Sequence, residues 1–250
     1  MATFLVVLLS AIVVGMVIGP IGAAMNGVKT WDEFLLMVVA GGAGGALALY
    51  GFYLFGIGVG IVGAAARTNF AFWATLVWSG LGLLGALLTP SLDKHENWFT
   101  NWLSFLLKWT HSPILTTVGI LVVIVAAIVG SQVGVRKGMI FVEAGQGTDG
   151  ITIGAICYAQ SGGGNWNGKK PSDLLAQHES VHGRACSAVG ELGFYVTYLA
   201  IGLPWGLIQG GSDGAFGLNN RGCGNPLEKL ASEYWDGFGG QQPQKSASNC

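Results

Sequence analysis

The sequence predicts a mainly α-helical, polytopic membrane protein with a small α+β region after its N-terminal helices. Only 10% of the 250 residues are charged, against about 25% in an ordinary soluble domain, and 51% are hydrophobic. The apolar residues lie in long blocks, as is typical of transmembrane helices. The 42 glycines fall mostly inside these blocks, where they let helix backbones approach closely. This composition excludes a soluble enzyme.

The net charge and the cysteine spacing indicate which partners the chain can bind. The net charge of −1 provides no basic stripe to neutralise phosphates, so the chain is not expected to bind nucleic acid. The lipid bilayer is the predicted partner, and a homo- or hetero-oligomer is compatible with the glycine content. Four cysteines contain no CxxC pair and do not indicate a zinc knuckle. Disulfides stay open, because they depend on the compartment that this region faces.

Four membrane spans are predicted within residues 1–137. The first block, 2–25, is long enough to cross about 30 Å of hydrocarbon and is expected to kink near Pro20. A cleaved signal peptide is the alternative for this block, although no Lys or Arg precedes it. The other three apolar blocks cover 34–66, 70–88 and 113–135.

A helix lying in the headgroup layer is predicted near 96–110. Aromatic residues recur there at helical spacing among polar side chains, from Trp98 to Trp109, which is typical of an interfacial helix. His95 and His111 flank this helix and are expected to be solvated or to face lipid headgroups.

The orientation of the spans stays open at this level. Basic residues favour the cytoplasmic side of a membrane, so the side whose loops hold more Lys and Arg is expected to be cytoplasmic. With four spans, each side of the membrane has three basic residues: Arg67, Arg136 and Lys137 on one side, and Lys29, Lys94 and Lys108 on the other.

From residue 138 to 238 the composition changes to that of a small α+β region. Two strands are predicted at 139–143 and 151–160, and a helix is expected to begin near Ser172. A further apolar segment, 192–208, is at the short limit for a span and is interrupted by Pro204, so it could also form a re-entrant hairpin. The tail, 239–250, is expected to be disordered.

The predicted helix carries the pattern HExxH, formed by His178, Glu179 and His182. Histidines four residues apart lie on one face of a helix, so both imidazoles can reach one tetrahedral Zn²⁺. The intervening glutamate then points at the open coordination position, where it can accept a proton from metal-bound water and pass it to a leaving amine. Two ordinary interfacial histidines are the alternative.

A third protein ligand is needed for such a site. Glu228 is the preferred candidate because it lies in a short predicted helix, Glu233 is the reserve, and a solvated carboxylate is the alternative role for either. Glu191 follows His182 by more than two helical turns and cannot fold back onto the metal. Arg184 could pair with Glu191 or polarise a bound carbonyl.

The order ITIGAICYAQ, DLLAQHESVHGRA, an apolar stretch with IGLP, and NPLEKLAS resembles a group of small, largely uncharacterised bacterial membrane proteins with a zincin-like metallopeptidase core. The resemblance covers about residues 150–235 and implies His178, His182 and Glu228 as zinc ligands, with Glu179 as general base. Members of the group usually carry Gly immediately before the second His, where this chain has Val181. The resemblance implies an inner-membrane location but no substrate.

Two function classes follow from these observations. The first is a membrane-embedded zinc metallopeptidase that cleaves a peptide segment of a membrane protein near the bilayer surface. The second is a non-catalytic scaffold or accessory subunit of a larger membrane complex, in which a metal is structural and closed off by a fourth ligand such as Cys186 or Cys223, or is absent. A transporter is disfavoured because the apolar blocks carry almost no charge.

Overall fold

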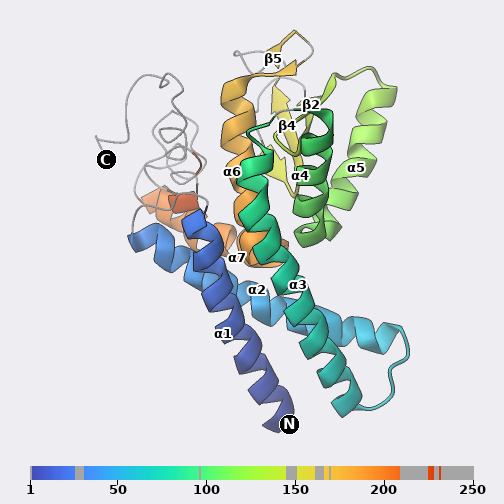
Figure 1. Cartoon of the computed structure of the whole chain (residues 1–250), viewed down its shortest axis with the longest axis vertical. Helices are drawn as coiled ribbons and strands as arrows, with labels where there is room; N and C mark the ends of the chain where they lie inside the picture. The colour runs from blue at the N-terminus through green and yellow to red at the C-terminus, as the bar shows by residue number, and fades with distance from the viewer. Residues whose placement is uncertain are drawn as a thin grey trace.

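The computed structural model describes residues 2–25, 31–95, 97–144, 151–160, 166–168, 170–208, 225–227 and 231. It is mainly helical, with a small sheet packed beside the helices at one end (Figure 1). The helices are α1 (Ala2–Met25), α2 (Trp31–Gly58), α3 (Ala64–Leu92), α4 (Trp98–His111), α5 (Pro113–Ile128), α6 (Asp173–Val189), α7 (Glu191–Thr197) and the π-helical turn η1 (Tyr198–Gly202).

Four helices of the described chain are long and apolar enough to cross a membrane. The expectation of a span at 113–135 is wrong, because α5 has 16 residues, and at 1.5 Å per residue reaches about 24 Å of the roughly 30 Å required. The chain turns at Gly130 (φ 88°) and continues as a strand. The four membrane-length segments are Thr3–Gly22, Glu33–Gly58, Ala64–Leu92 and Glu191–Ile208.

Glycines bring α1 and α2 into backbone contact. A Cβ atom at Gly15 would lie 2.0 Å from the carbonyl oxygen of Gly41, and one at Gly45 would lie 2.2 Å from the carbonyl oxygen of Ala11. Any side chain at these positions would force the two helices apart. The glycine clusters inside the apolar blocks therefore form a helix–helix interface, and α1 continues through Pro20 without interruption.

The last membrane-length segment contains the turn η1 directly before Pro204. A proline within a helix has no N–H to donate, and its ring clashes with the carbonyl four residues earlier, here that of Ala200. A wider π-helical turn relieves this clash and lets the helix continue to Ile208. The predicted interruption at Pro204 is thus a local widening within the helix.

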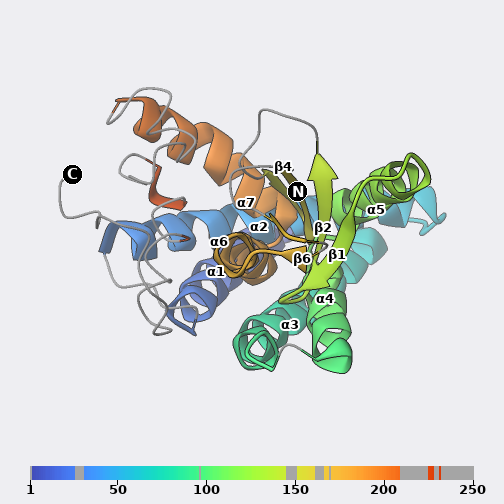
Figure 2. The same ribbon diagram turned by 90° about the horizontal axis from the view of Figure 1, so that it is seen from above.

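A four-stranded sheet packs between α6 and the pair α4 and α5 (Figure 2). The predicted strand 151–160 is two strands joined at Gly154 (φ 65°), and residues 133–136, expected at the end of a span, form a further strand. The order is β1 (Val133–Arg136), β2 (Met139–Ala144), β4 (Ile156–Gln160) and β3 (Ile151–Ile153); β2 and β4 are parallel and the outer pairs antiparallel. A separate hairpin joins β5 (Trp166–Asn167) to β6 (Lys170–Pro171).

Helix α4 confirms the helix predicted near 96–110, but one of its faces is buried against the protein. Trp98 and Phe99 are exposed, whereas Lys108 and His111 are buried. The ring of His111 stacks on that of Trp78 with centroids 4.9 Å apart. The expectation that His111 faces lipid headgroups is therefore wrong, and burial lowers its pKa to about 4.

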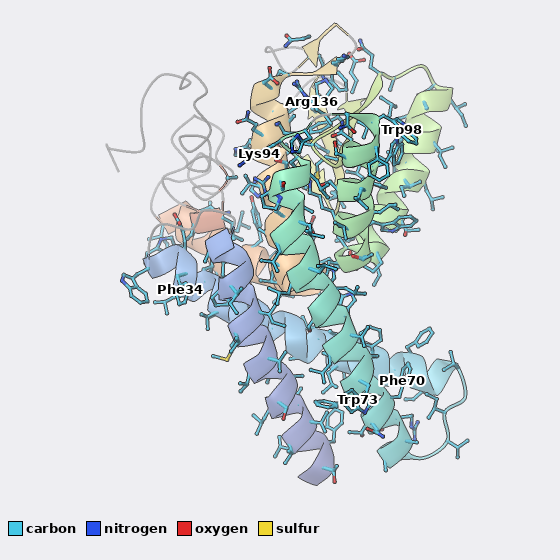
Figure 3. All side chains as sticks on the ribbon, viewed as in Figure 1. Phe34, Phe70, Trp73, Lys94, Trp98 and Arg136 are labelled. Carbon is cyan, nitrogen blue, oxygen red and sulfur yellow. The ribbon has the colours of Figure 1, made fainter. Side chains whose placement is uncertain are left out.

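The two ends of the molecule differ in chemistry. Lys94 and Arg136 lie at the end that carries the sheet and the start of α6, whereas Phe70 and Trp73 lie at the opposite end (Figure 3). One buried cluster joins α2 and α3 to α6 and α7, so the predicted units 1–137 and 138–238 share a core. The C-terminal half of the HExxH helix therefore packs among the membrane-length helices.

Candidate functional site

Helix α6 presents the HExxH residues and begins and ends where its sequence directs. The hydroxyl of Ser172 accepts a hydrogen bond from the backbone N–H of Leu175 (3.3 Å), which caps the first turn as the sequence predicts. The helix ends at Val189, because Gly190 adopts φ 77°, a left-handed conformation that favours glycine.

The two imidazoles of the motif converge. The Nε2 atoms of His178 and His182 lie 3.3 Å apart, and the rings meet edge to face. Two nitrogens bound to one tetrahedral zinc at 2.0–2.1 Å would be separated by about 3.3–3.4 Å. The same distance permits a hydrogen bond between the rings in one tautomeric arrangement. The observed separation fits two ligands of one zinc ion.

The carboxylate of Glu179 is buried and held by a hydroxyl. Its side chain is 4% exposed, and its Oε2 accepts a hydrogen bond from Oγ1 of Thr152 on strand β3 (2.5 Å). The thiol of Cys157 on the neighbouring strand has a raised pKa, first because it is buried and second because of the charge on Glu179. Thr152 therefore positions the carboxylate in a largely apolar surrounding.

Tyr195 of α7 ties this helix to the same strand. Its hydroxyl donates to the carbonyl oxygen of Thr152 (3.1 Å) and accepts from the backbone N–H of Gly154 (2.8 Å). Sequence reasoning assigned no role to Thr152 or Tyr195; the T-x-G step in ITIG was the available signal for the first. Strand β3 is at the edge of its sheet. Tyr195 bonds the carbonyl oxygen of Thr152, whose side chain contacts Glu179, and the N–H of Gly154.

We expect Tyr195→Phe to raise the amide hydrogen-exchange rate of Gly154 about fivefold, because the variant loses one hydrogen bond worth about 1 kcal/mol. Exchange measured by mass spectrometry on the detergent-purified chain checks this. Tyr158→Phe is the matched control, since that hydroxyl bonds the carbonyl oxygen of Gly119 instead. Equal exchange in wild type and Tyr195→Phe would show that the tyrosine does not protect this strand.

The preferred third ligand, Glu228, and the reserve, Glu233, lie outside the described residues. Leu227 and Ala231 belong to the buried cluster that contains Val181 of α6. Within the described part of the chain, no group of three or more His, Cys, Asp and Glu side chains is placed to hold a metal ion.

Asn225 connects two of the motifs that carry the resemblance. Its Oδ1 accepts from the backbone N–H of Leu227 (3.0 Å), and a Cβ atom at Gly202 would lie 2.6 Å from that same oxygen. The IGLP and NPLE motifs are therefore in contact.

Comparison of the chain with protein-family profiles, curated proteins and solved structures gave no match. The role of the site therefore rests on its own geometry and chemistry.

The departure from the resembled motif has a packing reason. Val181, which stands where those proteins usually have Gly, is 1% exposed and packs in the cluster formed with α2 and α7. Close approach occurs instead at Gly183, where a Cβ atom would lie 2.7 Å from the sulfur of Met139 on β2. In this chain the small residue follows the second histidine and faces the sheet.

The suggested pair between Arg184 and Glu191 is wrong. The carboxylate of Glu191 accepts from the hydroxyl of Ser112 and from the backbone N–H groups of Ile114 and Leu115 (3.0–3.1 Å), and so caps the start of α5. Cys186, suggested as a closing ligand, donates to the hydroxyl of Ser112 (3.6 Å).

Arg184 joins a buried ionic network around Asp93. The Asp93 carboxylate accepts from Arg184 (3.1 Å), from Nζ of Lys108 (3.0 and 3.1 Å) and from Oγ of Ser104 (2.6 Å). The network ties α6, two residues beyond His182, to α4 and to the end of α3. It also rules out Arg184 as a freely available group for polarising a carbonyl.

The same network makes stability depend on pH. Burial lowers the pKa of Lys108 from 10.5 to about 8, against the opposing attraction of Asp93. Below pH 8 both the folded and the unfolded chain keep this proton, whereas between pH 8 and 10.5 only the unfolded chain does. Stability contributed by Lys108 therefore rises across this window, by about 1.4 kcal/mol per pH unit.

We expect the melting temperature in detergent to rise between pH 7.5 and 9.5, and to rise more for wild type than for Lys108→Met. In that variant the Asp93–Arg184 pair stays while the titrating amine is removed. Equal pH dependence in the two proteins would contradict the lowered pKa of Lys108.

Proposed function

We propose that this chain is a zinc-dependent metallopeptidase that hydrolyses peptide bonds near the bilayer surface of the bacterial inner membrane. One observation carries the proposal: two histidine nitrogens 3.3 Å apart on α6, with the buried carboxylate of Glu179 between them in sequence.

Three side chains would hold the ion. His178 and His182 supply the two converging nitrogens, and Glu228 would supply the third ligand. Supporting this choice, Leu227 and Ala231, which flank it, are buried in the same cluster as Val181. When bound, zinc supplies a Lewis acid that polarises a peptide carbonyl and makes a nearby water more acidic.

Glu179 carries out the proton transfers. As general base its carboxylate accepts a proton from the attacking water, and as general acid it then returns that proton to the leaving amine. Thr152 holds the carboxylate through the hydroxyl bond, which limits its rotation.

The substrate class follows from the elements beside the site. Helix α7, which bears Tyr195, and its continuation expose a row of apolar side chains, among them Leu192, Val196 and Leu199. A peptide segment held in or on the membrane would contact this row. Pairing of an extended substrate with β3 would require Tyr195 to release Thr152 and Gly154.

Zinc content of the detergent-purified chain, prepared without chelators, tests the proposal. We expect about one zinc per chain in wild type and in His95→Ala, whose histidine is exposed and distant in sequence, and less than about a tenth of that in His178→Ala. Absence of zinc from the folded wild-type protein would refute a metallopeptidase.

The alternative function is a scaffold subunit, and one observation favours it. The carbonyl oxygen of Thr152 on β3 and the N–H of Gly154 directly after it are bonded to Tyr195, so neither is offered to a peptide in the described conformation. Zinc that is bound but that neither exchanges with solvent nor supports hydrolysis would indicate a closed structural site and this second role.

We also propose an orientation. If α5 does not span, the segment 93–190 stays on one side of the membrane together with residues 26–30, which follow α1 in the sequence. Of the six basic residues weighed for orientation, that side now holds five, Lys29, Lys94, Lys108, Arg136 and Lys137, and the other holds Arg67. The positive-inside rule then places the HExxH helix on the cytoplasmic side.

Cysteine labelling in intact cells checks this orientation. In a chain with Cys223 and Cys250 replaced by serine, a membrane-impermeant maleimide is expected to label Val62→Cys and to spare His95→Cys. The reverse pattern would place the N-terminus and Arg67 in the cytoplasm.

A further inference from the structure

An apolar groove runs along α3 at the end of the molecule away from the HExxH helix. Its volume is about 720 Å³, and Phe52 of α2 forms one wall. Phe70 and Trp73 lie at this end in Figure 3. Further lining residues on α3 are Val77, Trp78 and Leu81.

The dimensions of the groove suit one extended hydrocarbon chain. From Ala66 to Leu81 the lining follows α3 for about 22 Å, at 1.5 Å per residue, which lies within a hydrocarbon core about 30 Å thick. An apolar groove that follows one helix over this length suits a flexible hydrocarbon chain.

A single positively charged residue lies on the same turn of α3 as two residues that line the groove. Between Glu33 and Asp93 the sequence has one formally charged residue, Arg67. It occupies the same turn of α3 as Ala66 and Asn69, which line the groove.

The guanidinium of Arg67 is held in place. It lies 5.5 Å from the centre of the Tyr53 ring, and its Nε donates to the carbonyl oxygen of Gly63 (3.4 Å). These contacts use one face and one N–H of the planar fork. The two terminal amino groups of a guanidinium suit a phosphate or carboxylate ligand, which they can bind with two parallel hydrogen bonds.

We propose that this groove binds an anionic phospholipid, with one acyl chain along α3 and the phosphate of the headgroup at Arg67. The apolar walls supply affinity for the chain, and the isolated arginine supplies the preference for a negative headgroup. This site is independent of the HExxH chemistry, so it stands whether or not the chain binds zinc.

Native mass spectrometry of the full chain tests the proposal with phosphatidylglycerol and phosphatidylcholine of identical acyl chains. Wild type is expected to retain the anionic lipid about fivefold more than the zwitterionic one, the effect of one basic residue near a negative headgroup. Arg67→Gln is expected to abolish this preference. Lys94→Gln, an exposed change at the other end of the molecule, is expected to leave it intact.

Filling the groove tests the position of the acyl chain. Ala74→Leu and Val77→Trp each add bulk to the lining, and either one is expected to lower retention of both lipids at least threefold while melting stays cooperative. Equal retention of the two lipids by wild type would overturn the proposal. So would a preference that survives Arg67→Gln, or retention unchanged in both folded groove variants.

Discussion

Glu179→Gln is expected to remove peptide hydrolysis while leaving zinc bound. The amide has nearly the same shape as the carboxylate and can still accept the hydroxyl bond from Thr152, but it cannot accept a proton from water. A positioned general base contributes about 10²–10⁴-fold, so we expect kcat/KM to fall at least about a hundredfold. Hydrolysis of a fluorogenic peptide library by the detergent-purified chain, measured beside its zinc content, checks both halves of the expectation.

Thr152 provides the matched comparison for this experiment. Thr152→Val keeps the side-chain volume and removes the bond to Glu179, so a loss of about tenfold is expected, whereas Thr152→Ser keeps the hydroxyl and restores most of the activity. Full activity in Glu179→Gln would exclude this carboxylate as the base. Loss of zinc from that variant would instead show that the carboxylate holds the metal.

Asp93→Asn is expected to destabilise the protein by about 3–5 kcal/mol, the range found when one partner of a buried ion pair is removed. Asp93 is the acceptor for both Lys108 and Arg184, and all three side chains are buried. The amide would remove the negative charge that both cations contact. Denaturant unfolding in detergent, followed by circular dichroism, measures the change.

Asp173→Asn is the control for this prediction. Asp173 also pairs with an arginine, Arg136, but its side chain is 66% exposed, and exposed ion pairs contribute about 0–1 kcal/mol. Equal destabilisation by the two variants would contradict a special role for the buried network. If Asp93→Asn were as stable as wild type, the buried ionic network would not be needed to hold α6.

The sequence predicted the parts of this fold that depend on neighbouring residues. The first three membrane-length helices follow from apolar runs, and the start of helix α6 follows from the Ser172 cap; its end at Gly190 was not predicted. The i, i+4 spacing of His178 and His182 is likewise a local property, so their convergence could be anticipated. These features need no knowledge of the rest of the chain.

The partners of the site could not be predicted in this way, because they come from distant positions. Thr152 reaches Glu179 from 27 residues away, and Tyr195 reaches Thr152 from 43. Pairing of Asp93 with Arg184 spans 91 residues. The apolar run at 113–135 also gave no sign that it would end as a helix at Ile128, since Gly130 and the sheet beyond it decide that boundary.

The cap that Glu191 provides for α5 can form only late in the synthesis of the chain. The backbone N–H groups of Ile114 and Leu115 find their acceptor 77 and 76 residues further along the chain. At about 5–20 residues per second, a ribosome needs roughly 4–15 s to reach that residue. During this interval the start of α5 must be hydrated or held by a chaperone, so this helix docks only after the HExxH helix has been synthesised.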